Sequence, residues 1–207
     1  MLFRSRICFL TLTMKELEGK RILVTGGTGS LGQTLVRRIL TGECGLPAEI
    51  TVFSRDEAKQ HYMRLDFLHK ETATDDVIYQ NSRNILKFRI GDVRDYASLV
   101  AAMRGADIVF NAAALKQVPS CEYYPMEAIL TNIVGASNIV RAVRECALPV
   151  KKVIGISTDK ACKPINVMGM TKALQERVLI EANRDCPDVQ FNCVRYGNVI
   201  DRKSTRL

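Results

Sequence analysis

The sequence predicts an α/β fold in which a parallel β-sheet carries helices on both faces. Short apolar runs, each long enough for one strand, alternate with stretches whose apolar residues recur at helical spacing. A glycine-rich turn joins the first such strand to the first such helix. Because parallel strands need crossover connections, this alternation is typical of a doubly wound, Rossmann-like sheet.

The first unit contains the glycine-rich turn. The apolar run at 21–24 predicts a strand, and the apolar spacing over 31–40 predicts an amphipathic helix. Between them, Gly26 would let the chain turn, Gly29 would let a pyrophosphate approach the backbone, and Gly32 would let the helix pack closely on the sheet. Free N–H groups at the helix N-terminus would attract phosphates. The expected dinucleotide-binding residues are Thr25, Gly26, Gly27, Thr28, Gly29, Ser30, Leu31 and Gly32.

The second strand, at 49–54, ends about 20 residues beyond the turn, where such folds read the adenosine ribose. An acidic residue there would favour NAD, whereas this chain has Ser54 and Arg55. A guanidinium group suits a ribose 2′-phosphate, so NADP is favoured and NAD remains an alternative. Acidic residues follow directly and could instead cap the helix predicted over 57–70.

The third strand, at 86–90, ends in G-D-V. There Asp92, followed by Val93, could accept a hydrogen bond from the adenine amino group. A solvated helix cap is the alternative for Asp92, because a helix is predicted over 96–104.

The fourth strand, at 107–110, leads into small side chains that would let a ligand come close at the carboxyl edge of the sheet. A long helix is predicted over 125–146. The small residues are Ala112, Ala113 and Ala114.

Candidate catalytic groups follow the fifth strand, predicted at 152–156. The strand leads into S-T-D-K, and the next helix places Met168 and Lys172 on one face because they are four residues apart. A hydroxyl, a carboxylate and two ammonium groups would therefore converge at the carboxyl edge of the sheet. By itself, S-T-D-K is more typical of a helix-capping turn. The candidates are Thr158, Asp159, Lys160, Met168 and Lys172.

Composition and charge argue against several other classes of protein. Half of the formal net charge of +8 lies in residues 1–13 and 201–207, and no basic run is interleaved with aromatics, so no nucleic-acid partner is expected. The apolar run near the start is too short to span a bilayer, so no membrane partner is expected. The seven cysteines show no metal-ligand spacing, which predicts no metal site and reduced thiols in a cytoplasm.

One NAD(P)-binding domain is expected over residues 14–200. Residues 1–13 are interpreted as a non-native or disordered extension. The segment 201–207 (D-R-K-S-T-R-L) is what a common sequencing-library adapter encodes in this frame, so we expect an adapter-derived tail on a chain cut off inside a longer gene. Resequencing the source DNA across codon 200 tests this expectation. A sixth strand is predicted at 195–199, after which most of a carboxy-terminal substrate domain would be missing.

Six segments together resemble the extended short-chain dehydrogenase/reductase superfamily. They are T-G-G-T-G-S-L-G, F-S-R-D-E, G-D-V-R-D-Y, N-A-A-A-L-K-Q-V-P, T-N-I-V-G and S-T-D-K-A-x-x-P-I-N. More narrowly, they resemble capsule-type UDP-N-acetylglucosamine 4,6-dehydratases of polysaccharide biosynthesis. This resemblance implies an NADP-dependent, C5-inverting lyase that acts on a nucleotide sugar and assembles as a homo-oligomer.

The resemblance also implies residue roles. Asp159 would protonate the departing C6 hydroxyl, and Lys160 would remove the C5 proton. Lys172 would hold the nicotinamide ribose, and Thr158 would bond near the C4 hydroxyl. Substrate contacts are expected at Lys116 and Asn198.

One position departs from the superfamily pattern. Its Tyr-x-x-x-Lys pair is represented here by Met168 and Lys172. A thioether cannot exchange a proton, so the acceptor of the C4 hydroxyl proton stays open, with Lys160 or water as the options.

Two alternatives share the same fold. A nucleotide-sugar 4-epimerase also oxidises C4 but needs no acid and base for C5 and C6, so the pair Asp159 and Lys160 favours the dehydratase. In a non-catalytic NADP-binding regulator, Met168 would be a natural loss.

Overall fold

The computed structural model describes residues 15–67 and 84–197. The predictions made for 1–13, 201–207, Asn198 and the end of the helix expected to reach residue 70 lie outside these ranges. The strands are β1 Arg21–Thr25, β2 Glu49–Ser54, β3 Leu86–Ile90, β4 Ile108–Asn111, β5 Lys152–Thr158 and β6 Gln190–Tyr196. The helices are α1 Ser30–Leu40, α2 Glu57–Asp66, α4 Tyr96–Met103, α5 Val118–Tyr123, α6 Pro125–Ala128, α7 Gly135–Glu145 and α8 Val167–Asp185.

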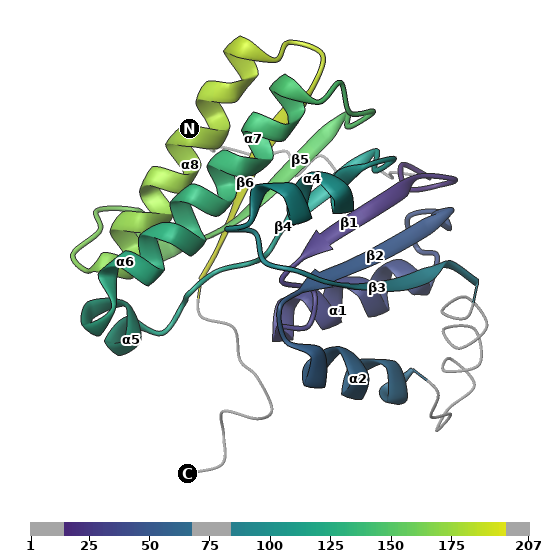
Figure 1. Ribbon diagram of the computed structural model, residues 1–207, viewed down its shortest axis with the longest axis horizontal. Helices are drawn as coiled ribbons and strands as arrows, with labels where there is room; N and C mark the ends of the chain where they lie inside the picture. The colour runs from purple at the N-terminus through teal and green to yellow at the C-terminus, as the bar shows by residue number, and fades with distance from the viewer. Residues whose placement is uncertain (1–14, 68–83, 198–207) are drawn as a thin grey trace, which may run out of the picture.

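All six strands pair in parallel in the order β3-β2-β1-β4-β5-β6 (Figure 1). The chain therefore moves outward from β1 in one direction and outward from β4 in the other. The direction reverses between β1 and β4, where Thr25 lies opposite Asn111. Ligands of open α/β sheets bind at such a switch point, at the carboxyl ends of the strands. The predicted doubly wound sheet is confirmed.

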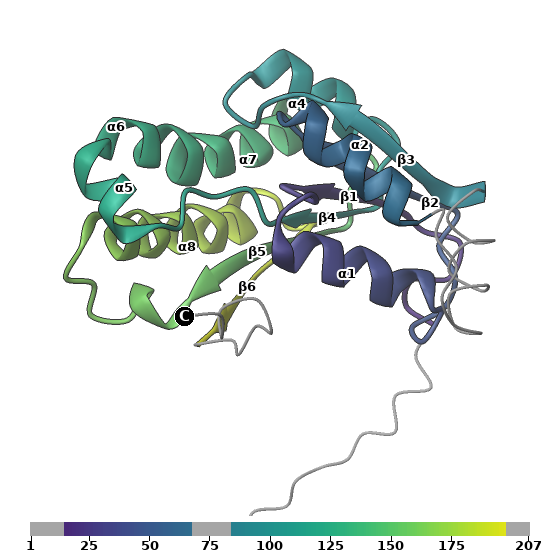
Figure 2. The same ribbon diagram turned by 90° about the horizontal axis from the view of Figure 1, so that it is seen from below.

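Two apolar cores cover the two faces of the sheet. Alternate residues of a strand point to opposite faces, so Ile22 and Val24 pack with α1 and α2, whereas Leu23 packs with α4, α7 and α8. Figure 2 shows α1 on one side of the sheet and α4 and α7 on the other. Within the described residues, no helix is long and apolar enough to cross a membrane.

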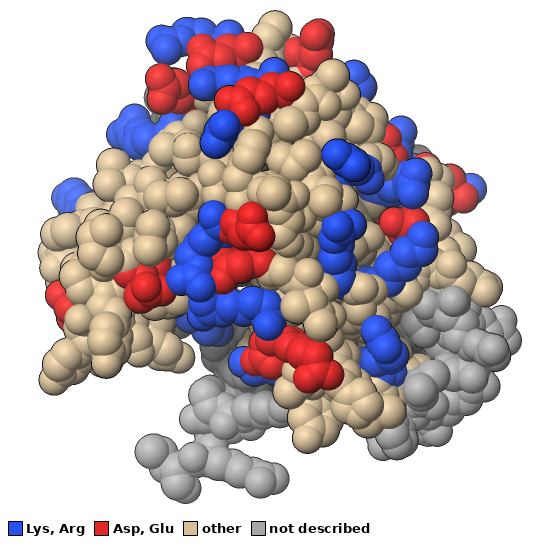
Figure 3. Space-filling model, viewed as in Figure 1, with Lys and Arg blue, Asp and Glu red and all other residues tan. Residues whose placement is uncertain are grey.

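Charged side chains of both signs lie next to each other on the face that carries α7 and α8 (Figure 3). Arg144 of α7 pairs with Asp185 at the end of α8, and Arg141 pairs with Glu145 at 2.9 Å. These exposed pairs lie at the ends of the two helices, and each stabilises the fold only weakly because water and salt screen them.

Beyond shifts of one residue at element ends, the structure differs from the sequence-based expectations in these details. The helix predicted over 125–146 contains a π-helical segment, Ile129–Val134, between α6 and α7. The short helix α5 was not predicted. Strand β5 extends to Thr158 because it pairs with β6 up to Tyr196. Strand β6 begins earlier than expected, at Gln190, and runs to Tyr196, since the alternating residues before Arg195 already belong to it; positions 198–199 of the predicted strand lie outside the described residues.

Candidate functional site

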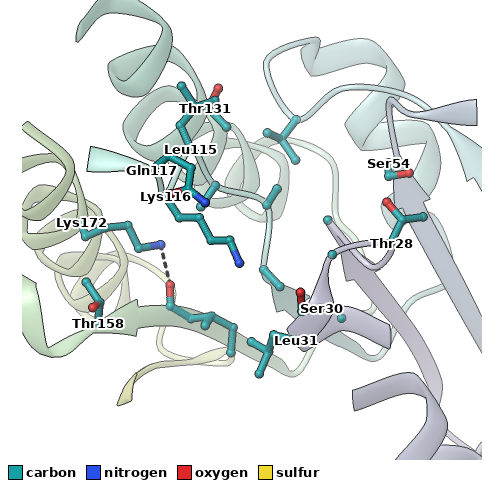
Figure 4. A pocket seen from close by; sticks show the side chains of 18 of the residues that line it. Thr28, Ser30, Leu31, Ser54, Leu115, Lys116, Gln117, Thr131, Thr158 and Lys172 are labelled. Atoms are coloured by element: carbon teal, nitrogen blue, oxygen red, sulfur yellow. Dashed lines mark hydrogen bonds between the residues drawn. The ribbon is translucent and has the colours of Figure 1, made fainter. Parts of the chain in front are cut away.

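A pocket of about 990 Å³ opens at the carboxyl edge of the sheet. Its walls come from the glycine turn with the start of α1, from the segment after β4, and from the end of β5 with α8 (Figure 4). These segments are far apart in sequence and meet because parallel strands all end at this edge. Among the predicted residues, those that line it are Gly26, Thr28, Gly29, Ser30, Leu31, Gly32, Ser54, Arg55, Asp92, Val93, Ala112, Ala113, Ala114, Lys116, Thr158, Lys160, Met168 and Lys172.

The glycine turn is shaped by two positions that exclude a side chain. Gly26 has a φ of +64°, and an added Cβ would lie 2.6 Å from the Ala113 backbone. At Gly32 an added Cβ would lie 2.5 Å from the Cα of Gly27, so Gly32 lets the first turn of α1 pack against the glycine turn. The expectation was that Gly32 would pack against the sheet.

The N-terminus of α1 faces the pocket through Gly29 and Ser30. Gly29 is the N-cap, and no side chain caps the helix or places a carboxylate in its first turn. The helix dipole and the first N–H groups therefore favour an anion such as a pyrophosphate.

Two of the predicted cofactor-binding residues lie beneath the turn and do not line the pocket. Thr25 is fully buried, and its hydroxyl donates to Asn111 Oδ1 at 2.7 Å. An added Cβ at Gly27 would lie 3.0 Å from Val52 Cγ1, so this glycine packs on the sheet. Both residues support the turn from below, and their contact with the cofactor stays a prediction.

The adenosine end of the pocket is lined by Ser54, Arg55 and Lys59. The Ser54 hydroxyl is buried and accepts a hydrogen bond from Gln60 Nε2 at 3.1 Å. The Arg55 side chain is half exposed, and its Nη1 lies 3.6 Å from Asp92 Oδ2. Two cations therefore border the position expected for the ribose, although Lys59 also pairs with the carboxylate that caps α2.

Asp92 is already engaged by Arg94. Arg94 Nη2 and Nε donate to Asp92 Oδ2 at 2.7 and 2.9 Å, and the Arg94 backbone N–H donates to Oδ1 at 3.0 Å. Burial acts to raise the pKa of Asp92, but the hydrogen bonds from Arg94 lower it overall. An adenine amino group would have to share this carboxylate with Arg94.

Lys172 is a buried amine on the wall of the pocket. Its Nζ donates to the Ile156 carbonyl and to Gln175 Oε1, both at 2.6 Å. Burial lowers the pKa of Lys172 to about 8. Met168 is also buried and lines the same pocket, as the four-residue spacing predicts.

The S-T-D-K segment forms a capped turn. Asp159 and Lys160 begin a short 3-10 helix, Asp159–Ala161, whose N-cap is Thr158. The Thr158 hydroxyl donates to Asp159 Oδ1 at 2.9 Å, and Lys160 Nζ lies 3.4 Å from the same oxygen. The hydrogen bond from Thr158 lowers the pKa of Asp159, and Asp159 does not line the pocket. The lowered pKa favours the ionised carboxylate, and an ionised carboxylate has no proton to give to a leaving hydroxyl.

Several polar groups of the site were not predicted. Glu176 is buried, and its Oε1 accepts a hydrogen bond from Arg195 Nε at 2.8 Å. The same carboxylate accepts a hydrogen bond from the Ser157 hydroxyl. Asn132, in the π-helical segment, binds the backbone of Leu115 through both its side-chain oxygen and its side-chain nitrogen. Glu176 could have been predicted, because Gln175 and Glu176 follow Lys172 by three and four residues and so share its helix face. Asn132 lies in the T-N-I-V-G segment of the resemblance, but that segment indicated no contact with Leu115.

Comparison with known proteins identifies the family. Residues 22–204 match the model of the polysaccharide biosynthesis protein family. The UDP-glucose 4-epimerases of Rickettsia bellii (strain RML369-C) and Rickettsia prowazekii (strain Madrid E) are each 48% identical over 184 residues, covering 87% of this chain and 49% of the relative. The chain thus spans about half the length of these curated relatives.

Solved structures show the same fold. The X-ray structure of Pen from Bacillus thuringiensis matches with a TM-score of 0.77 and 35% identity, covering 89% of this chain and 52% of that one. The UDP-Glc/GlcNAc 4-epimerase of Campylobacter jejuni matches with a TM-score of 0.71 and 21% identity, covering 91% of this chain and 58% of that one.

The expected UDP-N-acetylglucosamine 4,6-dehydratase activity is wrong, because the curated relatives at 48% identity are named UDP-glucose 4-epimerase. The argument for a lyase rested on Asp159 and Lys160 as an acid and a base, and the lowered pKa of Asp159 favours its ionised form. The segments behind the resemblance belong to the wider family. With a family match that spans most of the sequence, the chain belongs to the polysaccharide biosynthesis protein family of extended short-chain dehydrogenase/reductases.

Proposed function

We propose that the protein is a nucleotide-sugar 4-epimerase that inverts C4 of the hexose of UDP-glucose. The observation that carries this proposal is the 48% identity to relatives named UDP-glucose 4-epimerase, over a match that covers 87% of the chain. The chemistry of the pocket is compatible with it, since an epimerase acts at C4 alone and needs no acid at C6. The ionised state favoured for Asp159 by its lowered pKa is therefore no obstacle.

The pocket suits a nicotinamide dinucleotide, which would supply a reversible hydride acceptor at C4 of the sugar. Gly29 and Ser30 would hold its pyrophosphate at the uncapped N-terminus of α1. Arg55 and Lys59 favour NADP, because two cations border the expected ribose position. NAD is the alternative, since Asp56 lies between them in sequence and also lines the pocket.

The sugar would lie between the nicotinamide end and α8. Thr158 and Lys116 line this part of the pocket, and Figure 4 shows the Lys116 and Lys172 side chains reaching into the same space. We assign Thr158 to the sugar hydroxyls and Lys116 to the anionic nucleotide. A homo-oligomer in the cytoplasm completes the proposal, with reduced thiols at the cysteines.

The test uses protein expressed from the complete source gene. UDP-glucose is incubated with NAD or NADP in deuterated water, and the sugar is followed by proton NMR and mass spectrometry. Conversion to the C4 epimer without a change of mass supports the proposal. Loss of water would contradict it, and so would an untouched sugar in a protein that binds the dinucleotide, which is the behaviour of a non-catalytic regulator.

A further inference from the structure

Met168 occupies a place on the pocket wall where a proton acceptor would be useful. Oxidation of C4 requires that the C4 hydroxyl lose its proton, and the Met168 thioether cannot accept one. We propose that Lys172 accepts this proton directly and that Gln175 is the positioning residue that orients the Lys172 amine. The proposal rests on the 4-epimerase function proposed above.

The Lys172 amine is held by a rigid pair of acceptors. Its Nζ lies 2.6 Å from the Ile156 carbonyl oxygen and 2.6 Å from Gln175 Oε1. Gln175 is fully buried, and its Nε2 donates to the same Ile156 carbonyl at 3.2 Å. Because Ile156 belongs to β5, the three polar groups form a triangle that is fixed to the sheet.

This triangle determines where the lone pair of a neutral amine points. A neutral lysine has two N–H bonds and one lone pair, arranged tetrahedrally with the carbon stem. When the Ile156 carbonyl and Gln175 Oε1 take the two N–H bonds, the lone pair takes the remaining direction. Figure 4 shows Lys172 reaching from α8 to the pocket with its bond to the strand. The hydroxyl of a bound sugar would meet the lone pair there.

The surroundings of Lys172 lower its pKa to about 8, so the neutral amine and the ammonium are both populated near pH 8. Burial is the main cause of the lowered pKa, and the nearby Cys193 and Glu176 act against it. The Glu176 carboxylate is itself bound by Arg195 at 2.5 Å. The titratable or charged groups around Lys172 are Glu176 on α8, Cys193 and Arg195 on β6, Lys160 in the turn after β5, and Lys116 after β4.

Lys160, the option left open by the sequence, is less suited to this role. Its side chain is 44% exposed, and its Nζ lies 3.4 Å from the Asp159 carboxylate, in an ion pair at the surface. Lys172 is 5% exposed, and the two groups that accept its hydrogen bonds are uncharged.

The proposed step conserves atoms and charge. The O–H bond at C4 would break and an N–H bond would form on Lys172, while the C4 hydrogen would be taken as hydride by the bound oxidised dinucleotide. The products would be a 4-keto sugar, a Lys172 ammonium and the reduced dinucleotide. Return of the hydride to the other face of C4 and of the proton to O4 would give the C4 epimer. The neutral Lys172 amine and the oxidised dinucleotide would then be regenerated.

The first measurement is a titration that needs no substrate. We would label the lysine side chains with ¹³C and ¹⁵N, assign Lys172 with a Lys172→Arg variant, and follow its signals with pH by NMR. A midpoint near 8 is expected, and Gln175→Glu should raise it because a carboxylate stabilises the ammonium. Gln190→Glu is the matched control, since Gln190 is exposed on β6 and the same change there should leave the midpoint in place. A midpoint above about 10, the ordinary range of lysine, overturns the proposal for the wild type.

The second measurement is the pH profile of kcat/KM for epimerisation by the full-length protein. The rate should rise with pH through the midpoint found by NMR, and Gln175→Glu should move both values together. At a pH below both midpoints, kcat/KM should fall about tenfold for each pH unit by which the substitution raises the midpoint. If the kinetic midpoint stays in place while the NMR midpoint moves, Lys172 is not the proton acceptor, and the proposed 4-epimerase function is unaffected. No epimerisation by the wild type refutes the proposed function, and the proton-transfer step falls with it.

Discussion

Contact between Gly155 of β5 and Leu179 of α8 predicts how two substitutions combine. An added Cβ at Gly155 would overlap Leu179 Cδ1 and would lie 3.3 Å from Gln175 Nε2. Leu179 is fully buried in the core that covers this face of the sheet. Because proteins are densely packed here, either change alone should destabilise the fold.

The magnitudes differ in origin. Leu179→Ala removes a fully buried side chain and leaves a cavity, which should lower the free energy of unfolding by about 3 kcal/mol. Gly155→Ala adds a methyl group where Leu179 already packs, and this steric overlap should lower the free energy of unfolding by about 2 kcal/mol. In the double variant the added methyl group occupies part of the cavity, so the combined cost should fall at least about 1 kcal/mol short of the sum.

Urea unfolding followed by circular dichroism measures all three variants. With a slope of about 2 kcal/mol per molar urea, Leu179→Ala should move the midpoint by about 1.5 M. Leu174→Ala is the control on the same helix, since Leu174 is 52% exposed and should cost less than about 0.5 kcal/mol. Costs that simply add would show that the two residues do not share a contact, and the packing argument would fail.

Three further outcomes are expected. Gly26→Ala should abolish dinucleotide binding by calorimetry, because its φ is +64° and the new Cβ would meet the Ala113 backbone; binding at wild-type strength would contradict the assigned turn. Arg55→Ser should weaken NADP about tenfold and NAD little in a fluorescence titration, since a charged hydrogen bond contributes about 1.5–3 kcal/mol; equal losses would remove the NADP preference. The hydrogen bond from Arg195 lowers the pKa of Glu176, so its stabilising effect is present above the unfolded pKa near 4.5 and is lost as pH falls through the lower folded value. Glu176→Gln should therefore lose less stability than the wild type in urea unfolding between about pH 6 and pH 3, and parallel losses would refute this.

The predicted catalytic segment shows where local pattern and chemistry separate. The sequence placed Thr158, Asp159 and Lys160 at the carboxyl edge of the sheet, and the structure has them there. It could not say which of them face the pocket. That depends on the 3-10 turn after β5, in which the Thr158 hydroxyl binds the Asp159 carboxylate; Thr158 and Lys160 line the pocket and Asp159 does not.

The strands and the glycine turn could be predicted from the amino-acid sequence because both are local. Period-two and helical apolar patterns need only neighbouring residues, and Glu49–Ser54 and Leu86–Ile90 were predicted to the residue. The surroundings of each site residue, in contrast, depend on how the layers pack. Lys172 acquires its lowered pKa from burial, and its two acceptors come from different elements, Ile156 of β5 and Gln175 of α8. Desolvation and hydrogen bonding across elements arise only when helix and sheet meet, and no pattern within one element records that.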